Sequence, residues 1–234
     1  MVDEPAVEQL VAAAVLFDMD GVLLDSTAGV EALWVAFAHE HALDVDEVVG
    51  DLHGRRMADV IRRHLPELTA SQLAEEIARF EQAEVADAAD VEVLPGAIAL
   101  TRGLAGASWA IVTSSNRVVA EARLAHSGLP TPPVLVTADD VRRGKPAPDP
   151  YRQAAAALGV APGDTVVFED APAGLAAGRA AGGTVVALAT SHPLAALSDA
   201  DHVVDDLTAV TLEVADEQLS LTLIGTRRPD GRGA

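Results

Sequence analysis

Two acidic residues close a short apolar run near the start of the chain, in the order Ala12-Ala13-Ala14-Val15-Leu16-Phe17-Asp18-Met19-Asp20-Gly21. The apolar run predicts a β-strand over residues 12–17 that is buried on both faces. Because side chains alternate along a strand, Asp18 and Asp20 share one side of its carboxyl end. Two carboxylates held together need a cation or a proton between them. Ligands bind at the carboxyl ends of strands in open α/β sheets, so the stretch predicts the front of an active site.

Two other interpretations fit this stretch when it is taken alone. The sequence Asp-x-Asp-Gly also occurs in acidic turns and in calcium-binding loops. The calcium loop is disfavoured because the next residues, Val22, Leu23 and Leu24, are apolar and offer no oxygen ligands. Gly21 permits the tight turn that carries the chain away from the strand in either case. Matching segments farther along the chain decide between these interpretations.

A hydroxyl-rich segment, Thr113-Ser114-Ser115-Asn116, follows a predicted strand over residues 109–113 and begins a predicted helix. A hydroxyl group together with the free backbone N–H groups of a helix start forms an anion site. The same residue types also serve as ordinary helix caps. Taken with the acidic strand end, this segment favours a site for an anionic ligand.

The segment Gly144-Lys145-Pro146 contains the only lysine of the chain, which has fifteen arginines. A composition so biased toward arginine would place arginine at an indifferent surface position. The retained lysine indicates that a compact point charge is wanted there, with chance retention as the alternative.

A second pair of acids, Glu169 and Asp170, follows the predicted strand over residues 165–168. Asp170 alone could be the cap of the helix that comes next. Four carboxylates at neighbouring strand ends, however, require a divalent cation. Oxygen ligands without a nearby histidine or cysteine favour Mg²⁺.

The stretch Phe17-Asp18-Met19-Asp20-Gly21-Val22-Leu23-Leu24-Asp25-Ser26 resembles the first signature motif of the haloacid dehalogenase superfamily, and the three later segments resemble its other motifs in the same order. The resemblance covers residues 17–174. It implies an α/β fold, with a Rossmann-like parallel sheet as core and an inserted α-helical cap. It also implies a phosphatase mechanism with an aspartyl-phosphate intermediate.

The resemblance further implies a role for each motif residue. Asp18 is the expected nucleophile, and Asp20 is the expected general acid and base. Thr113, the Ser114 amide and Lys145 are the expected phosphate-binding groups. The expected ligands of Mg²⁺ are Asp18, the backbone carbonyl of Asp20, and Asp170, with Glu169 acting on the ion through water.

Residues within the cap narrow the choice among members of the superfamily. Halide-removing members lack an acid at the position of Asp20, and phosphonate-cleaving members use a cap lysine, which residues 26–91 do not contain. The segment His53-Gly54-Arg55-Arg56 resembles the caps of small sugar-phosphate and polyol-phosphate phosphatases, although it is also an ordinary basic helix start. His53 and Arg56 are then expected to contact sugar hydroxyls or a second anionic group, with Arg55 and Asn116 as lesser candidates.

Two alternatives to such a phosphatase remain. A β-phosphoglucomutase-like isomerase shares the core and the cap type, but it has a lysine before the cap glycine and an arginine three residues after it. This chain has His53 and Met57 at those positions. The second alternative is a non-catalytic binding or regulatory protein on the same scaffold.

The order of the predicted elements divides the chain into a core, residues 1–25 and 92–234, and an α-helical cap, residues 26–91. Apolar spacing predicts cap helices over residues 27–41, 55–65 and 71–88. Further strands are predicted over 134–137, 184–188 and 202–204, with helices over 97–105, 116–127, 150–158 and 172–181, the third capped by Asp149. Alternating strands and helices predict a parallel sheet. Residues 1–11 are expected to be a loose lead-in, and the tail from about residue 215 is expected to fray.

Composition limits the partners of the protein. The formal net charge of −20 argues against nucleic acid and anionic membranes, which both favour a basic surface. The apolar run over residues 10–17 is too short to span a bilayer, and it lacks the basic leader of a signal peptide. The absence of cysteine excludes disulfides and thiolate sites. We therefore expect a cytoplasmic monomer or weak homodimer that binds a small phosphorylated metabolite.

Overall fold

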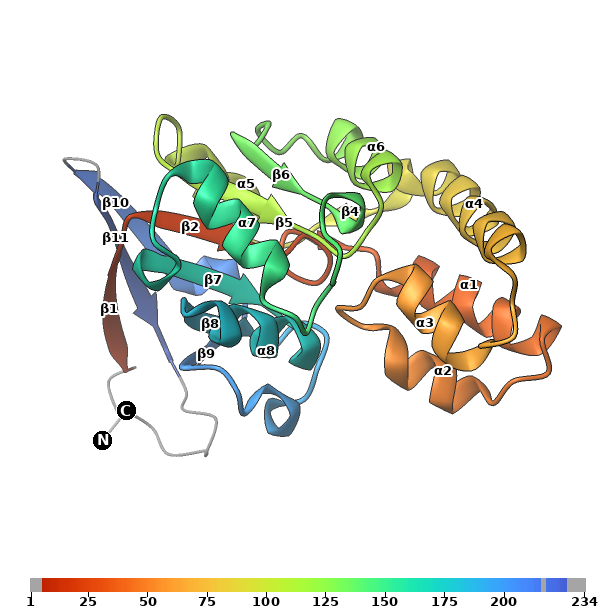
Figure 1. Ribbon diagram of the computed structural model, residues 1–234. Coiled ribbons are helices and arrows are strands. Elements are labelled where there is room, and N and C mark those ends of the chain that lie inside the picture. Colours follow the sequence, from red (N-terminus) through yellow and green to blue (C-terminus); the bar gives the residue numbers. More distant parts are fainter. Residues whose placement is uncertain (1–5, 216–217, 227–234) are drawn as a thin grey trace.

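The computed structural model of the protein describes residues 6–215 and 218–226. A parallel sheet with the strand order β6-β5-β2-β7-β8-β9 forms its centre (Figure 1). Its strands are β2 (Ala14–Phe17), β5 (Trp109–Val112), β6 (Val134–Val136), β7 (Thr165–Glu169), β8 (Thr184–Leu188) and β9 (His202–Val204). The parallel sheet predicted from the alternation of strands and helices is thus confirmed.

Both faces of this sheet are covered by helices. Val15 and Phe17 of β2 belong to one apolar cluster, whereas Leu16 between them belongs to another, as the alternation of side chains requires. The first cluster includes residues of α5 (Ala97–Gly103) and α6 (Arg117–Ser127). The second includes residues of α7 (Asp149–Leu158) and α8 (Pro172–Ala181). This two-sided burial explains why the strands are continuous apolar runs.

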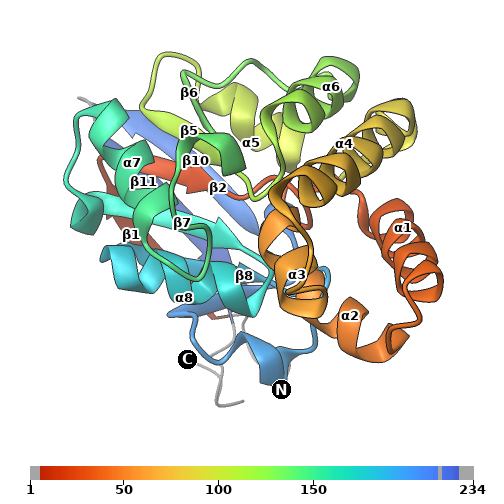
Figure 2. The ribbon, with the colours of Figure 1, turned by 45° about the vertical axis from the view of Figure 1, so that its right-hand side comes forward.

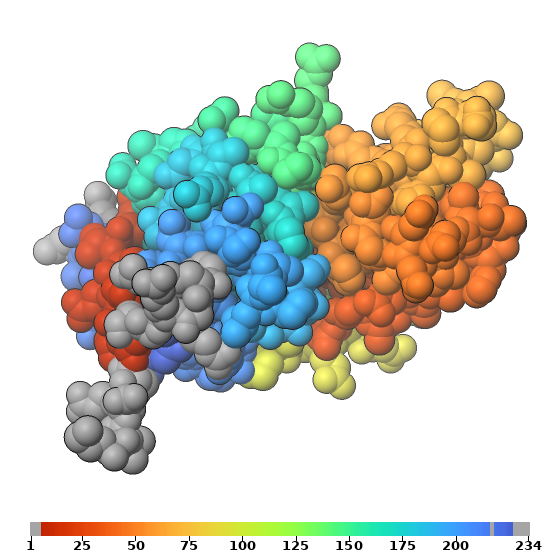
Figure 3. Space-filling model, turned by 90° about the horizontal axis from the view of Figure 1, so that it is seen from below, coloured from red at the N-terminus to blue at the C-terminus, as the bar shows by residue number. Residues whose placement is uncertain are grey.

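Four helices interrupt the chain after β2 and form a block beside the sheet: α1 (Thr27–Glu40), α2 (Val45–Leu52), α3 (Met57–His64) and α4 (Ala70–Ala86) (Figures 1 and 2). They have an apolar cluster of their own, in which Phe80 lies with its ring centre 4.6 Å from Trp34 and 5.5 Å from Phe37. The chain enters and leaves the block through the paired short strands β3 (Leu24–Asp25) and β4 (Glu92–Val93). Figure 3 shows this block as an orange mass beside the blue and cyan core.

The helix α2 was not predicted from the sequence. It begins at Asp44, whose side chain accepts a hydrogen bond from the Glu47 amide at 3.0 Å. Its eight residues include only two that are buried, Val48 and Leu52, so its apolar periodicity is short. Helix α7 also differs from the prediction in detail, because Pro148 rather than Asp149 is its cap.

The expectation that the chain is loose near both ends is wrong for the residues that the structure describes there. Residues 7–12 form the strand β1 (Val7–Ala12), and residues beyond 215 form the strand β11 (Gln218–Ile224), which lies between β1 and β10 (Val210–Ala215) in an antiparallel sheet. In β11, Leu219, Leu221 and Leu223 are buried while their neighbours face outward. This alternation stabilises a strand because one face packs on the core, so neither residues 7–12 nor residues 218–224 are loose. The expectations for residues 1–5, 216–217 and 227–234 lie outside the described residues.

The predicted strand over residues 12–17 is in fact two strands. Ala12 ends β1, the Ala13 amide donates to the Asp164 carbonyl at 2.7 Å, and Ala14 begins β2. The remaining short elements are 3₁₀ turns at Ala88–Asp90, Ala138–Asp140, Pro162–Asp164, Leu194–Leu197 and Leu207–Ala209. Within the described ranges, no helix combines the length and the apolar character needed to cross a membrane.

Candidate active site

Three acidic side chains meet at the carboxyl edge of the parallel sheet. Asp18 follows β2, and Glu169 and Asp170 lie at the end of the neighbouring strand β7. One carboxylate oxygen from each lies within 4.8 Å of the other two, and all three residues are buried. The register of the two strands, in which Phe17 lies opposite Phe168, brings these acids together.

Lys145 pairs with two of these carboxylates. Its Nζ lies 2.8 Å from Asp18 Oδ1 and 2.6 Å from Glu169 Oε1, and its side chain is fully buried. Tyr151 donates a further hydrogen bond to Glu169 Oε1. Although burial by itself lowers the pKa of Lys145, the charges of Asp18 and Glu169 outweigh it and raise that pKa. Lys145 is therefore a permanent cation in the site.

The acidic cluster carries more negative charge than Lys145 can balance. Burial, followed by the charge of Glu169, raises the pKa of Asp18 well above its ordinary value, and Lys145 opposes this only in part. The same two causes raise the pKa of Asp170 to about 7. When all three carboxylates are ionised, they leave an excess of two negative charges over the one ammonium. A divalent cation with oxygen ligands matches that excess and the spacing of the oxygens.

Gly21 makes room for this cluster. A Cβ atom at Gly21 would lie 1.9 Å from Asp170 Oδ2, and its φ of +78° is in the left-handed region that favours glycine. The neighbouring loop after β8 also reaches the cluster, because Ser191 Oγ donates to Asp170 Oδ2. Ser191 was not identified from the sequence, since no motif marks it.

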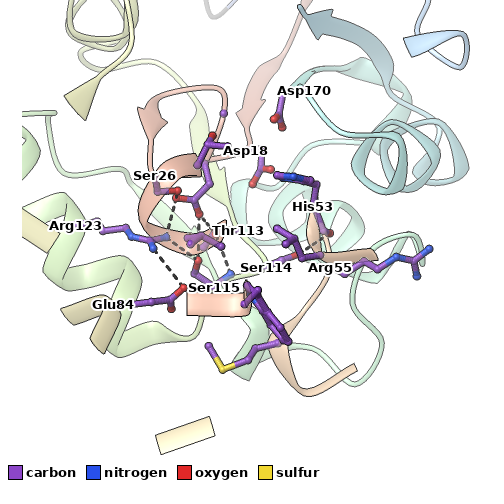
Figure 4. Close-up of a pocket in the computed structure, with 18 of the residues that line it drawn as sticks. Asp18, Ser26, His53, Arg55, Glu84, Thr113, Ser114, Ser115, Arg123 and Asp170 are labelled. Carbon is purple, nitrogen blue, oxygen red and sulfur yellow. Dashed lines mark hydrogen bonds and ion pairs between the residues drawn. The ribbon is translucent and has the colours of Figure 1, made fainter. Parts of the chain in front are cut away.

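The hydroxyl-rich segment after β5 borders the same pocket as the acids. Thr113, Ser114 and Ser115 all line it, together with Asp18 and Asp170 (Figure 4). Thr113 Oγ1 accepts a hydrogen bond from the Ser115 amide at 3.0 Å. Because Asn116 makes no side-chain capping hydrogen bond to α6, the segment is not an ordinary side-chain cap. The structure thus brings the predicted phosphate-binding residues to the predicted nucleophile.

The side chain of Asp20 lies apart from the acidic cluster. Its Oδ1 accepts hydrogen bonds from Ser26 Oγ and from Arg123 Nη1, each at 2.8 Å. Its Oδ2 lies 3.1 Å from Ser115 Oγ and 3.4 Å from Thr113 Oγ1. The sequence predicted that Asp18 and Asp20 would share one side of the strand end. Both residues line the pocket, and these contacts turn the Asp20 carboxylate toward α6.

Arg123 and Glu84 are site residues that the sequence analysis missed. Both are buried, and both line the pocket. A signal was present, because each charged residue occupies an apolar stripe of its helix. Arg123 continues the α6 stripe through Val119 and Ala120, and Glu84 continues the α4 stripe through Leu73 and Phe80. Charged residues at such positions are rare unless they are paired.

Most of the predicted cap residues also border the pocket. His53, Gly54 and Arg55 line it, and the Gly54 carbonyl accepts a hydrogen bond from Ser114 Oγ at 2.9 Å. His53 Nε2 lies 3.4 Å from Glu31 Oε1. Burial lowers the pKa of His53, and the charge of Glu31 opposes this effect. These contacts bring the loop between α2 and α3 against the predicted phosphate-binding segment, Thr113 to Asn116.

Arg56 and Asn116 make contacts that join the helical block to the core. Arg56 pairs with Asp59 at 2.7 Å, and its Nη1 donates to the Val141 carbonyl at 3.1 Å. Arg56 is not among the residues that line the described pocket, so its contact with a substrate stays a prediction. Asn116 does line the pocket, and its amide donates to Glu81 of α4.

The comparisons with known proteins agree with this fold and site. The family model described as haloacid dehalogenase-like hydrolase matches residues 12–182. Hexitol phosphatase A of Escherichia coli is 42% identical over 199 residues, which cover 84% of this chain and 92% of that protein. The 2-deoxyglucose-6-phosphate phosphatase 1 of Saccharomyces cerevisiae is 33% identical over 220 residues, which cover 84% of this chain and 89% of that protein. The chain therefore belongs to the haloacid dehalogenase-like hydrolases, and it is a phosphatase of that family.

The solved structures agree on the fold. The β-phosphoglucomutase of Clostridium difficile superposes with a TM-score of 0.75, covering 84% of this chain and 92% of that one, at 22% sequence identity. At this identity the likeness shows the fold alone. The predicted α/β class, with a Rossmann-like sheet and inserted helices, is confirmed.

Proposed function

We propose that the protein is a Mg²⁺-dependent phosphatase that hydrolyses a small phosphorylated sugar or polyol through an aspartyl-phosphate on Asp18. One observation carries the proposal. Asp18, Asp20 and Thr113 line one pocket, and Lys145 contacts the Asp18 carboxylate at 2.8 Å. This arrangement supplies a nucleophile, phosphate-binding groups and an acid in one place.

In the first step, an oxygen of Asp18 forms a bond to phosphorus while the ester bond from phosphorus to the sugar oxygen breaks. Asp20 gives its proton to the departing alkoxide. Thr113, the Ser114 amide and Lys145 hold the phosphoryl oxygens, so that most of the rate enhancement is positional and electrostatic. Mg²⁺, when bound by Asp18, Asp170 and the Asp20 carbonyl, supplies charge neutralisation for the phosphoryl group.

In the second step, Asp20 as a carboxylate takes a proton from water, and the water oxygen attacks the phosphorus of the aspartyl-phosphate. The bond from phosphorus to Asp18 breaks, which regenerates the Asp18 carboxylate and releases phosphate. Glu169 has no direct part in these bonds. Its hydrogen bonds with Lys145 and Tyr151 keep the ammonium in place for both steps.

The proposed substrate class depends on the cap, residues 26–91, which we propose is a domain that closes over the core. Its loop contributes His53 and Arg55 to the pocket, and its first helix contributes Trp34. Side chains with donors and acceptors beside an apolar ring suit a polyhydroxylated carbon chain. Two of the relatives are named as phosphatases of a hexitol phosphate and of 2-deoxyglucose 6-phosphate, which supports the same class.

A panel of phosphate esters tests this proposal. With Mg²⁺, we expect inorganic phosphate from hexitol, deoxyhexose and glycerol phosphates, and at least 10-fold lower kcat/KM for nucleoside monophosphates. His53→Ala should lower kcat/KM for the best sugar or polyol ester by about 10-fold, the order expected for one lost polar contact. The exposed His126 gives the matched control, since His126→Ala should leave the panel unchanged.

Two results would contradict the proposal. Exchange of sugar phosphate isomers without net phosphate release would indicate a mutase. Binding of phosphate esters without turnover, with Mg²⁺ present, would indicate a non-catalytic protein.

Addition of Mg²⁺ should stabilise the protein, and Asp170→Asn should remove most of that effect. An ion bound to the native protein at 100 times its Kd adds about 2.7 kcal/mol to the free energy of unfolding. The midpoint temperature of thermal unfolding, Tm, should therefore rise by several degrees in Mg²⁺ and return to its starting value in EDTA. Asp199→Asn, on an exposed loop, is the matched control and should retain the full rise. An equal rise in Asp170→Asn would place the ion elsewhere.

A further inference from the structure

Arg123 of α6 is a buried cation that contacts the residue assigned here as general acid and base. Its side chain is 3% exposed, and its Nη1 lies 2.8 Å from Asp20 Oδ1 and 3.3 Å from Ser115 Oγ. A buried guanidinium needs carboxylate partners, because an unpaired buried charge costs several kcal/mol. Arg123 Nη1 donates to both Asp20 and Ser115, which line the pocket. Arg123 therefore belongs to the site as well as to the buried face of α6.

Glu84 of α4 pairs with the second terminal nitrogen, Nη2, of the same guanidinium. Its Oε1 lies 3.5 Å from Arg123 Nη2, and its side chain is 8% exposed (Figure 4). Burial raises the pKa of Glu84 to about 7, and the charge of Arg123 opposes this effect. The proximity of Arg123 is thus what favours the carboxylate form of Glu84. Together the two contacts tie a helix of the cap, through one arginine, to Asp20.

The contacts of Asp20 differ between its two oxygens. Oδ1 accepts from Arg123 as well as from Ser26, and because a guanidinium only donates, a proton on Oδ1 would face an Arg123 N–H group. Oδ2 lies near the hydroxyls of Thr113 and Ser115, which can accept as well as donate. When Asp20 is protonated, its proton therefore belongs on Oδ2, the oxygen beside the phosphate-binding Thr113.

We propose that Arg123, held by Glu84, is a positioning residue that fixes Oδ1 of Asp20 and so directs the acid proton, on Oδ2, toward the leaving group. The inference rests on the proposed function, because it assigns Arg123 to the proton transfer of that reaction. Its consequence concerns leaving groups. An alkoxide from a polyol phosphate must take a proton to depart, whereas acetate departs from acetyl phosphate as a stable anion.

The test compares kcat/KM for a hexitol phosphate and for acetyl phosphate, with Mg²⁺, since this constant reports the steps up to formation of the phosphoenzyme. Arg123→Met should lower kcat/KM for the hexitol ester by about 10- to 100-fold, the range of general acid catalysis, and that for acetyl phosphate by less than about 3-fold. Arg123→Lys, which keeps the charge, should recover part of the loss. Glu84→Gln should lower the ratio of kcat/KM for the hexitol ester to kcat/KM for acetyl phosphate, by a smaller factor than Arg123→Met does.

Arg117→Met removes an ion pair from the same helix and is the matched control, because Arg117 pairs with Asp140 outside the pocket. It should leave the ratio of the two substrates unchanged. If Arg123→Met does not fold, Arg123→Lys and Glu84→Gln provide the comparison. Equal losses for both substrates, or no loss, would overturn the inference while leaving the phosphatase intact. A wild-type protein that hydrolyses neither ester would instead overturn the proposed function.

Discussion

Asp18→Asn is expected to lower phosphate release by about 10⁴-fold or more, because the variant has no carboxylate to attack phosphorus and an amide is a poor nucleophile. The variant should still fold. Burial and the neighbouring Glu169 already disfavour the charged form of Asp18, so replacing that charge by a neutral isostere removes repulsion from the cluster. Steady-state phosphate release and a thermal melt in metal-free buffer measure the two effects.

Mass spectrometry after acid quenching adds a direct readout of the intermediate. Wild-type protein mixed with substrate should show a species heavier by one phosphoryl group, and Asp18→Asn should not. Asp199→Asn serves again as the matched control, since its side chain is exposed and remote from the pocket. Phosphate release at a wild-type rate from Asp18→Asn would assign the nucleophile to another residue and refute the proposed mechanism.

Lys145→Met should damage both activity and stability. The side chain of Lys145 is fully buried, and it balances Asp18 and Glu169 at 2.8 and 2.6 Å. Removing one partner of a buried ion pair costs about 3–5 kcal/mol, because the remaining charges are left without compensation. Activity should fall by about 10³-fold, as for the loss of one group that stabilises charge in the transition state. Urea denaturation and phosphate release measure these losses.

Arg143→Met is the matched control for Lys145→Met. Arg143 lies two residues earlier in the same loop, and it pairs with Asp149 on the surface with 70% of its side chain exposed. An exposed ion pair contributes about 0–1 kcal/mol, so its loss should change little. A stability loss in Lys145→Met no larger than that in Arg143→Met would show that the buried carboxylates do not depend on the lysine.

Most of the candidate groups of the site could be picked out from the sequence because they lie directly after buried strands. Asp18, Thr113 and Asp170 follow continuous apolar runs, which are recognisable locally and which end at one edge of a parallel sheet. Lys145 was picked out in a different way, because it is the only lysine of the chain and composition can be read without a structure. Strand order and register were then needed only to bring these residues within bonding distance.

The elements that the sequence missed depend on partners far away in the chain. The strands β1 and β11 pair Val7 with Ile224, and neither end shows from its own residues that the other is beside it. Helix α2 has too few buried positions for a clear period. The contacts of Asp20 were missed in the same way, because Arg123 lies 103 residues later, and its place in the apolar stripe of α6 does not show which acid it contacts.

By itself, the sequence indicated the family of this protein, the alternation of strands and helices in its core, and the candidate reactive groups, because all three follow from local patterns along the chain. Only the tertiary structure decided which side chains each acid contacts. It groups Asp18 with Glu169 and Asp170 beside Lys145, and it pairs Asp20 with Arg123 of α6. The physical reason is burial: a charged side chain inside the protein must find its counter-charge, and that partner is fixed by packing between distant elements and not by neighbours in sequence.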